Sequence, residues 1–323
     1  MDNNSFEILV SNLTNPTLLF FLLGIVAALL KSDLEIPATS IKFISLYLLF
    51  SIGFKGGQEL EHSDPGAEIW YSILFGTAIA TLIPVYSFFL LKSRVGISNA
   101  GAIAASYGSV SAVTFVSAVS FLEIQGQPFD AHMIAVMALM EFPAIIMGFV
   151  LIMKYDKERN RSISLGGILK HAISNGSVLM IVGSLVIGIV ADSKQAEGIK
   201  PFTTDIFKGF LAIFLLEMGM ITVKRFSSFK KHGLYVFLFA ILMPLFNGSA
   251  VALLSHFVSD VAGTRFIFAI LAASASYIAV PAAMRLAAPN ADPGLYIPMA
   301  LGVTFPLNIT LGFPLYYMLV QYA

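Results

Sequence analysis

The chain has 323 residues, 19 basic and 19 acidic side chains, and no cysteine. Hydrophobic residues make up 57% and charged residues 12%, about half of the roughly 25% charge of soluble proteins, so a water-facing surface is excluded. The zero net charge gives no electrostatic reason to expect nucleic acid as a partner, and the lack of cysteine removes disulfides and thiolate chemistry. We therefore expect an integral membrane protein.

Ten apolar runs follow one another along the chain, separated by charged or Pro/Gly-rich breaks. We expect each run to form a transmembrane helix of about 20 residues, because a chain in hydrocarbon must satisfy its own backbone hydrogen bonds. The fold class predicted is thus all-α. The acidic first sixteen residues lack the basic start of a signal peptide, so we expect the first run to be retained. The runs centre on residues 18–30, 41–54, 69–91, 100–122, 131–153, 178–190, 207–221, 234–258, 266–286 and 295–320.

Lysine and arginine residues concentrate in alternate loops. The loops after the odd-numbered runs hold most of them, whereas the opposite side holds Lys55, Lys194, Lys200 and Arg265. The positive-inside rule therefore predicts a multi-pass protein of the cytoplasmic (inner) membrane with both termini outside the cytoplasm. Lys208 lies inside the seventh run, where we expect its amine to snorkel to the interface.

Three pairs of segments resemble each other in the same order along the two halves of the chain. Residues 104–121 and 272–289 read AASYGSVSAVTFVSAVSF and AASASYIAVPAAMRLAAP, with a shared AAS start. The weaker pairs are LFSIGFKGG with FLLEMGMIT, from residues 49 and 214, and FPAIIMGF with FPLNITLGF, from residues 142 and 305.

These pairs predict a duplication of five spans, with a first repeat in residues 1–155 and a second in residues 156–323. A repeat with an odd number of spans must insert its second copy upside down, which is the architecture of many secondary transporters.

Spans four and nine carry too many hydroxyl groups for helices that face lipid. Gly108 weakens the first helix and Pro281 lacks an amide hydrogen in the second, so we expect each to be discontinuous near its middle. Half-helix N-termini attract an anion, and nearby carbonyls and hydroxyls ligate a small cation. Close helix packing is the alternative explanation for any single serine. The matching positions in both halves favour a binding site.

Glu141 lies in the fifth run beside Pro143. A charged side chain at the bilayer centre costs about 2.5–3.5 kcal/mol, so we expect Glu141 to ligate a coupling cation or to carry a proton. A hydrogen-bonded packing residue is the alternative. We expect no enzyme, because no acid, base and nucleophile converge in the sequence and it contains no P-loop or zinc-ligand spacing.

The segments YGSVSAVTFVSAVSFLE (107–123) and AASASYIAVPAAMR (272–285), followed by PNADP (289–293) and Phe305-Pro306, resemble the sodium-dependent bicarbonate transporter family. The similarity extends along the whole chain. It implies a homotrimer with no cofactor, in which sodium is the coupling ion. It also implies a scaffold or gate from residues 11–64 and 172–226, and a mobile core from residues 65–155 and 227–323.

The resemblance further implies that substrate and sodium bind where spans four and nine cross. Ion coupling is expected of Glu141, Ser111, Ser276 and Tyr277. The substrate-binding positions that it implies are Gly108, Ser109, Val110, Ser111, Ala112, Val113, Thr114, Ser274, Ala275 and Ser276.

The chain departs from the family pattern in two places. Tyr277 stands where the family has an acidic residue, and Ala279 and Val280 replace a serine and a glycine. The sodium ligands and the selectivity for bicarbonate therefore stay open. The connection 154–170 is shorter than the regulatory loop of the family, so control by a PII-like signalling protein is not assumed.

We therefore expect a secondary active transporter that takes up bicarbonate, or a similar small monovalent anion, together with sodium by an elevator-type movement. A proton-coupled carrier of a small organic acid that uses Glu141 is the alternative, because the acidic residue is missing at Tyr277. A non-transporting membrane sensor is less favoured, since no soluble output domain is recognisable in the sequence.

Overall fold

The computed structural model describes residues 14–61, 66–156, 174, 176–229, 233–277, 280, 281, 283, 284 and 288–322, with the backbone alone for 226–229. Within these residues the secondary structure is helical and contains no strand. Seven helical segments are long and apolar enough to cross a membrane, and three shorter apolar helices lie at other positions where spans were predicted. The all-α membrane fold is thus confirmed, whereas the count of ten spans and the inverted repeat stay predictions.

The helices follow the predicted runs closely. In the first half these are α2 (Pro16–Leu29), α3 (Ala38–Glu61), α4 (Ala67–Val95), α5 (Ile97–Gly108), α6 (Ala112–Ile124) and α7 (His132–Tyr155). In the second half they are α9 (Gly176–Val190), α10 (Ser193–Ala196), η1 (Glu197–Ile199), η2 (Pro201–Asp205), α11 (Phe207–Phe229), α12 (Leu234–Leu254), η4 (Ser255–Phe257) and α13 (Ala262–Ala273). The last helical segment comprises α15 (Pro293–Met299), η5 (Ala300–Thr304), α16 (Phe305–Leu307), η6 (Asn308–Gly312) and α17 (Phe313–Tyr322).

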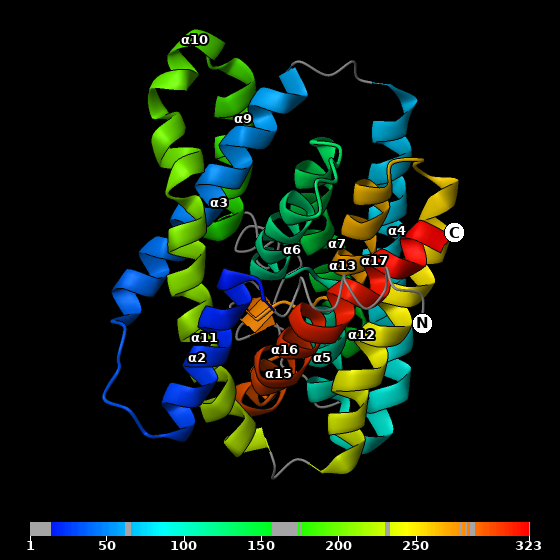
Figure 1. Ribbon diagram of the computed structural model, residues 1–323. Helices are drawn as coiled ribbons and strands as arrows, with labels where there is room; N and C mark the ends of the chain where they lie inside the picture. Colours follow the sequence, from blue (N-terminus) through cyan, green and yellow to red (C-terminus); the bar gives the residue numbers. More distant parts are fainter. Residues whose placement is uncertain are drawn as a thin grey trace.

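The helices form two groups that lie side by side (Figure 1). The four-helix group consists of α2, α3, α9 and α11, in which α3 packs along α9 and α2 packs along α11. The larger group consists of α4–α7, α12, α13 and α15–α17. Within it α5 packs against α4 and α7, while α13 packs against α12 and α17. The two groups touch through α3, α9 and α11, which reach α6, α7, α15 and η5.

Glycines allow the backbones of the four-helix group to approach closely. A Cβ on Gly57 of α3 would collide with the backbone of Leu185 and Gly188 in α9. A Cβ on Gly219 of α11 would collide with the backbone of α2 around Gly24. Small residues at such contacts are typical of membrane helix pairs, which associate through close packing because lipid supplies no hydrophobic driving force.

The last helical segment contains two π-helical turns, η5 and η6, and each is followed two residues later by a proline, Pro306 or Pro314. A proline ring clashes with the carbonyl four residues earlier in a regular α-helix. For these prolines that carbonyl belongs to Gly302 or Thr310, inside the π turn. The wider turn makes room for the ring, so the segment continues through both prolines instead of ending.

Candidate functional site

Spans four and nine are both interrupted, and the interruptions have the same geometry. The helices that precede them, α5 and α13, each have 12 residues. Ser109 follows α5 with φ −85° and ψ 170°, and Ser274 follows α13 with φ −81° and ψ 165°. Helix α6 then begins at Ala112, and in the second half Val280 and Pro281 are again helical.

The two interruptions contact each other directly. The Ser111 amide donates a hydrogen bond to the Ser274 hydroxyl oxygen at 3.0 Å. The Ser276 amide donates to the Ser106 carbonyl at 2.8 Å, and the Ser106 hydroxyl donates to the Ser276 carbonyl at 2.5 Å. All four serines are at most 4% exposed. These bonds replace the intrahelical hydrogen bonds that each segment loses where its helix ends.

The serine three residues after the last residue of each helix caps the segment that follows. The Ser111 hydroxyl oxygen accepts from the Thr114 amide at 3.2 Å, at the start of α6. The Ser276 hydroxyl oxygen accepts from the Val280 amide at 3.4 Å. An N-cap serine stabilises a helix start by satisfying one of its free amides. The shared device is therefore the sequence Ser-x-Ser, at Ser109–Ser111 and Ser274–Ser276.

This geometry corrects two details expected from the sequence. The shared AAS start aligns Ser106 with Ser274. In the structure the residue equivalent to Ser274 is instead Ser109, three residues further along, because these two serines directly follow α5 and α13. The break in span nine occurs at 274–277, ahead of Pro281, which lies in the helical backbone that follows. The break therefore does not lie at Pro281 itself.

Glu141 lies beside the break of span four, in a small cavity between the two helix groups. The carboxylate is 8% exposed, and its Oε2 atom has no hydrogen-bond partner among the described residues. The cavity volume is about 10 Å³, which holds about one water molecule. Its walls come from α3, α9, α7 and the break: Leu49, Val110, Ala112, Met137, Ala138, Glu141, Ser177, Val178 and Ile181.

Some of the remaining predicted site residues place polar side chains at the helix crossing, whereas others only pack against neighbouring helices. The buried hydroxyl of Ser109 has no partner within the described part of the chain, so it is available to a ligand. The Tyr277 hydroxyl interacts with the Ser111 side chain. Thr114 and Ala275 are 1% and 3% exposed next to the breaks. Gly108 instead packs on α4, where a Cβ would collide with the ring of Pro84.

Asn308 was not among the predicted site residues, yet it supports the crossing. Its side-chain amide donates to the carbonyl of Ala273, the last residue of α13, at 2.8 Å. Its Oδ1 atom accepts from the Tyr316 hydroxyl at 3.2 Å, so the amide is held in place. An asparagine inside an apolar run was the sequence signal, because polar side chains within a membrane bond across helices.

Lys208, which was expected to snorkel to the interface, pairs with Glu123 at the end of α6. The Lys208 amine lies 3.1 Å from one Glu123 oxygen, and Lys55 of α3 lies 3.5 Å from the other. These ion pairs join the four-helix group to the larger group beside a cavity of about 280 Å³. Ala279, most of the connection 154–170 and the first thirteen residues lie outside the described residues.

The comparison with family models matches almost the whole chain, whereas no curated protein gives a significant match. The matching model is that of the Na⁺-dependent bicarbonate transporter superfamily, and it covers residues 16–321, which include all ten predicted runs and both helix breaks. This is a family of transporters and not of enzymes, in agreement with the resemblance found in the sequence. The chain belongs to the Na⁺-dependent bicarbonate transporter superfamily.

Proposed function

We propose that this protein is a secondary active transporter that imports bicarbonate, or a similarly small monovalent anion, together with sodium. The observation that carries the proposal is the crossing of the two interrupted helices, joined by the hydrogen bond from Ser111 to Ser274. Interrupted helices that meet inside an apolar molecule expose backbone dipoles where both ions of a transporter can bind.

The ends of the half-helices supply charges of both signs. The first-turn amides of α6, from Ala112 onward, carry partial positive charge and favour an anion. The last carbonyls of α5 and α13 carry partial negative charge and, with the Ser109 and Tyr277 hydroxyls, favour a small cation.

Glu141 gives a reason for coupling the two ions. Val110 and Ala112 line the same cavity as its carboxylate, so an anion that enters there meets a negative charge. A sodium ion bound beside the carboxylate offsets that charge, and each ion then raises the affinity of the site for the other.

The packing of the helices supports an inverted repeat and an elevator movement. The contact of α2 with α11 has its counterpart in that of α9 with α3, and the contacts of α5 with α4 and α7 have theirs in those of α13 with α12 and α17. The four-helix group then acts as the scaffold and the larger group as the moving core. Since the cavity at Glu141 lies between the groups and holds about one water, it must widen to admit an anion.

Uptake of ¹⁴C-bicarbonate into liposomes that contain the purified protein tests this proposal. An inward sodium gradient should drive accumulation above the level of protein-free liposomes, and replacing sodium with choline should abolish it. Uptake that is the same in sodium and in choline would refute the coupling. The homotrimer implied by the family resemblance is tested separately, by the mass of the protein in detergent.

A second candidate is a proton-coupled carrier of a small organic acid. The observation in its favour is the buried Oε2 atom of Glu141, which has no partner within the described residues and can bind a proton instead of sodium. Glu141→Gln should then remove the pH dependence of uptake, with acetate or lactate as the test substrates. Uptake of these acids that stays pH-dependent in Glu141→Gln would exclude this candidate.

A further inference from the structure

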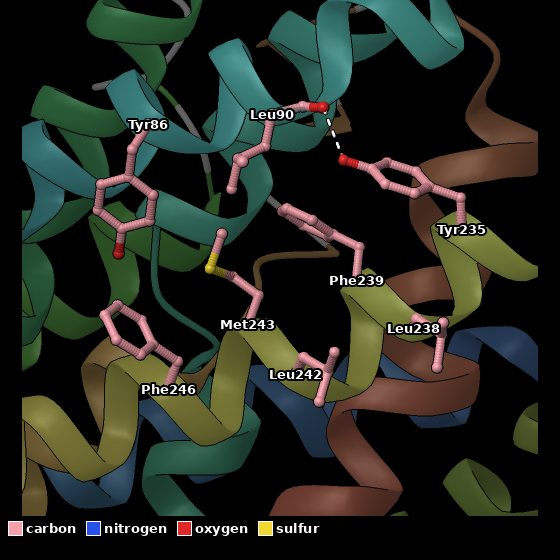
Figure 2. A pocket seen from close by; sticks show the side chains of 8 residues that line it. All are labelled: Tyr86, Leu90, Tyr235, Leu238, Phe239, Leu242, Met243 and Phe246. Atoms are coloured by element: carbon pink, nitrogen blue, oxygen red, sulfur yellow. Dashed lines mark hydrogen bonds between the residues drawn. The ribbon is translucent and has the colours of Figure 1, made fainter.

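An apolar groove runs along the outer surface of the larger group, between α4 and α12 (Figure 2). Its volume is about 360 Å³, within the range of about 300–1,000 Å³ that is typical of small-molecule sites. Leu242 and Phe246 of α12 are 58% and 65% exposed along it, so the groove opens outward. Its lining residues are Tyr86, Leu90, Tyr235, Leu238, Phe239, Leu242, Met243 and Phe246.

The groove offers only hydrocarbon, sulfur and ring surface to an occupant. The two tyrosine hydroxyls that line it are both satisfied inside the protein. Tyr235 donates to the Leu90 carbonyl at 2.8 Å, and Tyr86 donates to Asn247 Oδ1 at 2.6 Å. With no donor or acceptor left over from these groups, the part of a ligand that enters the groove must be apolar.

One end of the groove is basic. Tyr86, Leu90 and Arg94 follow at four-residue spacing, so they share one face of α4. The Arg94 guanidinium stacks on the Tyr235 ring at 5.2 Å, which leaves its in-plane N–H donors for an anion. The positive-inside count assigns this end to the cytoplasmic face.

We propose that this groove is a binding site for an anionic glycerophospholipid, with an acyl chain along α12 and the phosphate at Arg94. An apolar channel that ends in a stacked arginine matches an amphiphile with a negative headgroup, since basic residues at the cytoplasmic face of membrane helices recognise such headgroups. Because α4 and α12 belong to different halves of the chain, the lipid bridges the two halves.

The experiment is thermal unfolding of the delipidated, full-length protein in detergent, titrated with dioleoylphosphatidylglycerol or with dioleoylphosphatidylcholine. The anionic lipid should raise the unfolding temperature at lower concentration than the neutral lipid. Arg94→Gln should weaken the response to phosphatidylglycerol by about fivefold and should leave the response to phosphatidylcholine unchanged. Lys200→Gln, which removes an exposed lysine far from the groove, is the matched control and should behave as the wild type.

Leu242→Trp tests the groove itself, because the larger side chain fills it from an exposed position. It should weaken the response to both lipids, whereas Leu179→Trp, at an exposed apolar position of α9, should not. Equal responses of the wild type to the two lipids, or a full response to phosphatidylglycerol in Leu242→Trp, would overturn the proposal. Loss of an oligomer in Leu242→Trp would also overturn it, since a second copy of the chain would then occupy the groove.

Discussion

The backbone amide of Ser111 and the hydroxyl oxygen of Ser274 lie 3.0 Å apart and form a hydrogen bond between residues 163 positions apart in the sequence. Both side chains are almost fully buried, at 4% and 1% exposure. The bond joins the break after α5 to the break after α13, so the geometry of either break depends on the other. A site built at this crossing therefore needs both halves of the chain.

Removing the Ser274 hydroxyl should impair transport. Ser274→Ala leaves the buried Ser111 amide without its acceptor, which costs about 1–3 kcal/mol. The start of α6 should shift, and sodium-dependent uptake should fall about tenfold or more. Uptake by liposomes with equal amounts of wild-type and variant protein measures the effect.

Ser120→Ala is the matched control for this substitution. Ser120 is a buried serine of α6 whose hydroxyl has no partner among the described residues, so its removal breaks no hydrogen bond to any of them. Its uptake should stay near that of the wild type. If Ser274→Ala transports as well as Ser120→Ala, the crossing does not hold the site.

Gly188→Ala should destabilise the four-helix group. The added methyl group would collide with the backbone of Phe54 and Gly57 in α3, and overpacking of this kind costs about 1–3 kcal/mol. Gly183→Ala in the same helix is the control, because no atom lies within 4 Å of its added Cβ. Thermal unfolding in detergent should show a lower midpoint for Gly188→Ala alone. Equal midpoints would contradict the close packing of α3 on α9.

Cross-linking the two helix groups should stop transport if the larger group moves. The chain has no cysteine, so Lys55→Cys and Glu123→Cys would be the only reactive thiols in a double variant. A short bifunctional maleimide is suited to this pair, since it spans Cα separations beyond the roughly 7 Å limit of a disulfide. Treatment should block uptake, while the untreated double variant should transport.

Gln58→Cys with Ala191→Cys is the control pair, because both positions lie in the four-helix group, where the Gln58 amide bonds the Ala191 carbonyl at 3.0 Å. The same reagent should leave its uptake intact. Uptake that persists in the fully cross-linked Lys55–Glu123 variant would rule out relative movement of the groups at this contact.

The sequence was sufficient to predict the helical membrane fold and the family. Apolar runs report directly on burial in lipid, so the described helices lie close to the predicted ranges. The interruption of spans four and nine was also predictable, because glycine, serine and proline all weaken helices locally. The exact position of the break in span nine was not predictable. Pro281 gave the stronger local signal, whereas the break lies at 274–277, where hydrogen bonds to the other half of the chain replace the helical ones.

Two further features of the structure that the sequence did not predict are contacts between residues far apart in the chain. The amide of Asn308 reaches the end of α13 across 35 residues, and the amine of Lys208 meets Glu123 of a different helix group. Such pairs depend on how the helices pack, and neither hydropathy nor the spacing along one helix contains that information. Charged residues placed in apolar runs showed that a partner was needed but not which one it was.

Thermal unfolding of the purified protein with bicarbonate, in sodium and in choline buffers, tests the coupling of the two ions most directly. A ligand that binds only the folded protein at 100 times its Kd raises the stability by about 2.7 kcal/mol, so binding is visible as a higher midpoint. We expect bicarbonate to raise the midpoint in sodium and to have little effect in choline, with Ser274→Ala losing the response. An equal rise in both buffers, or none in either, would contradict a coupled site at the helix crossing.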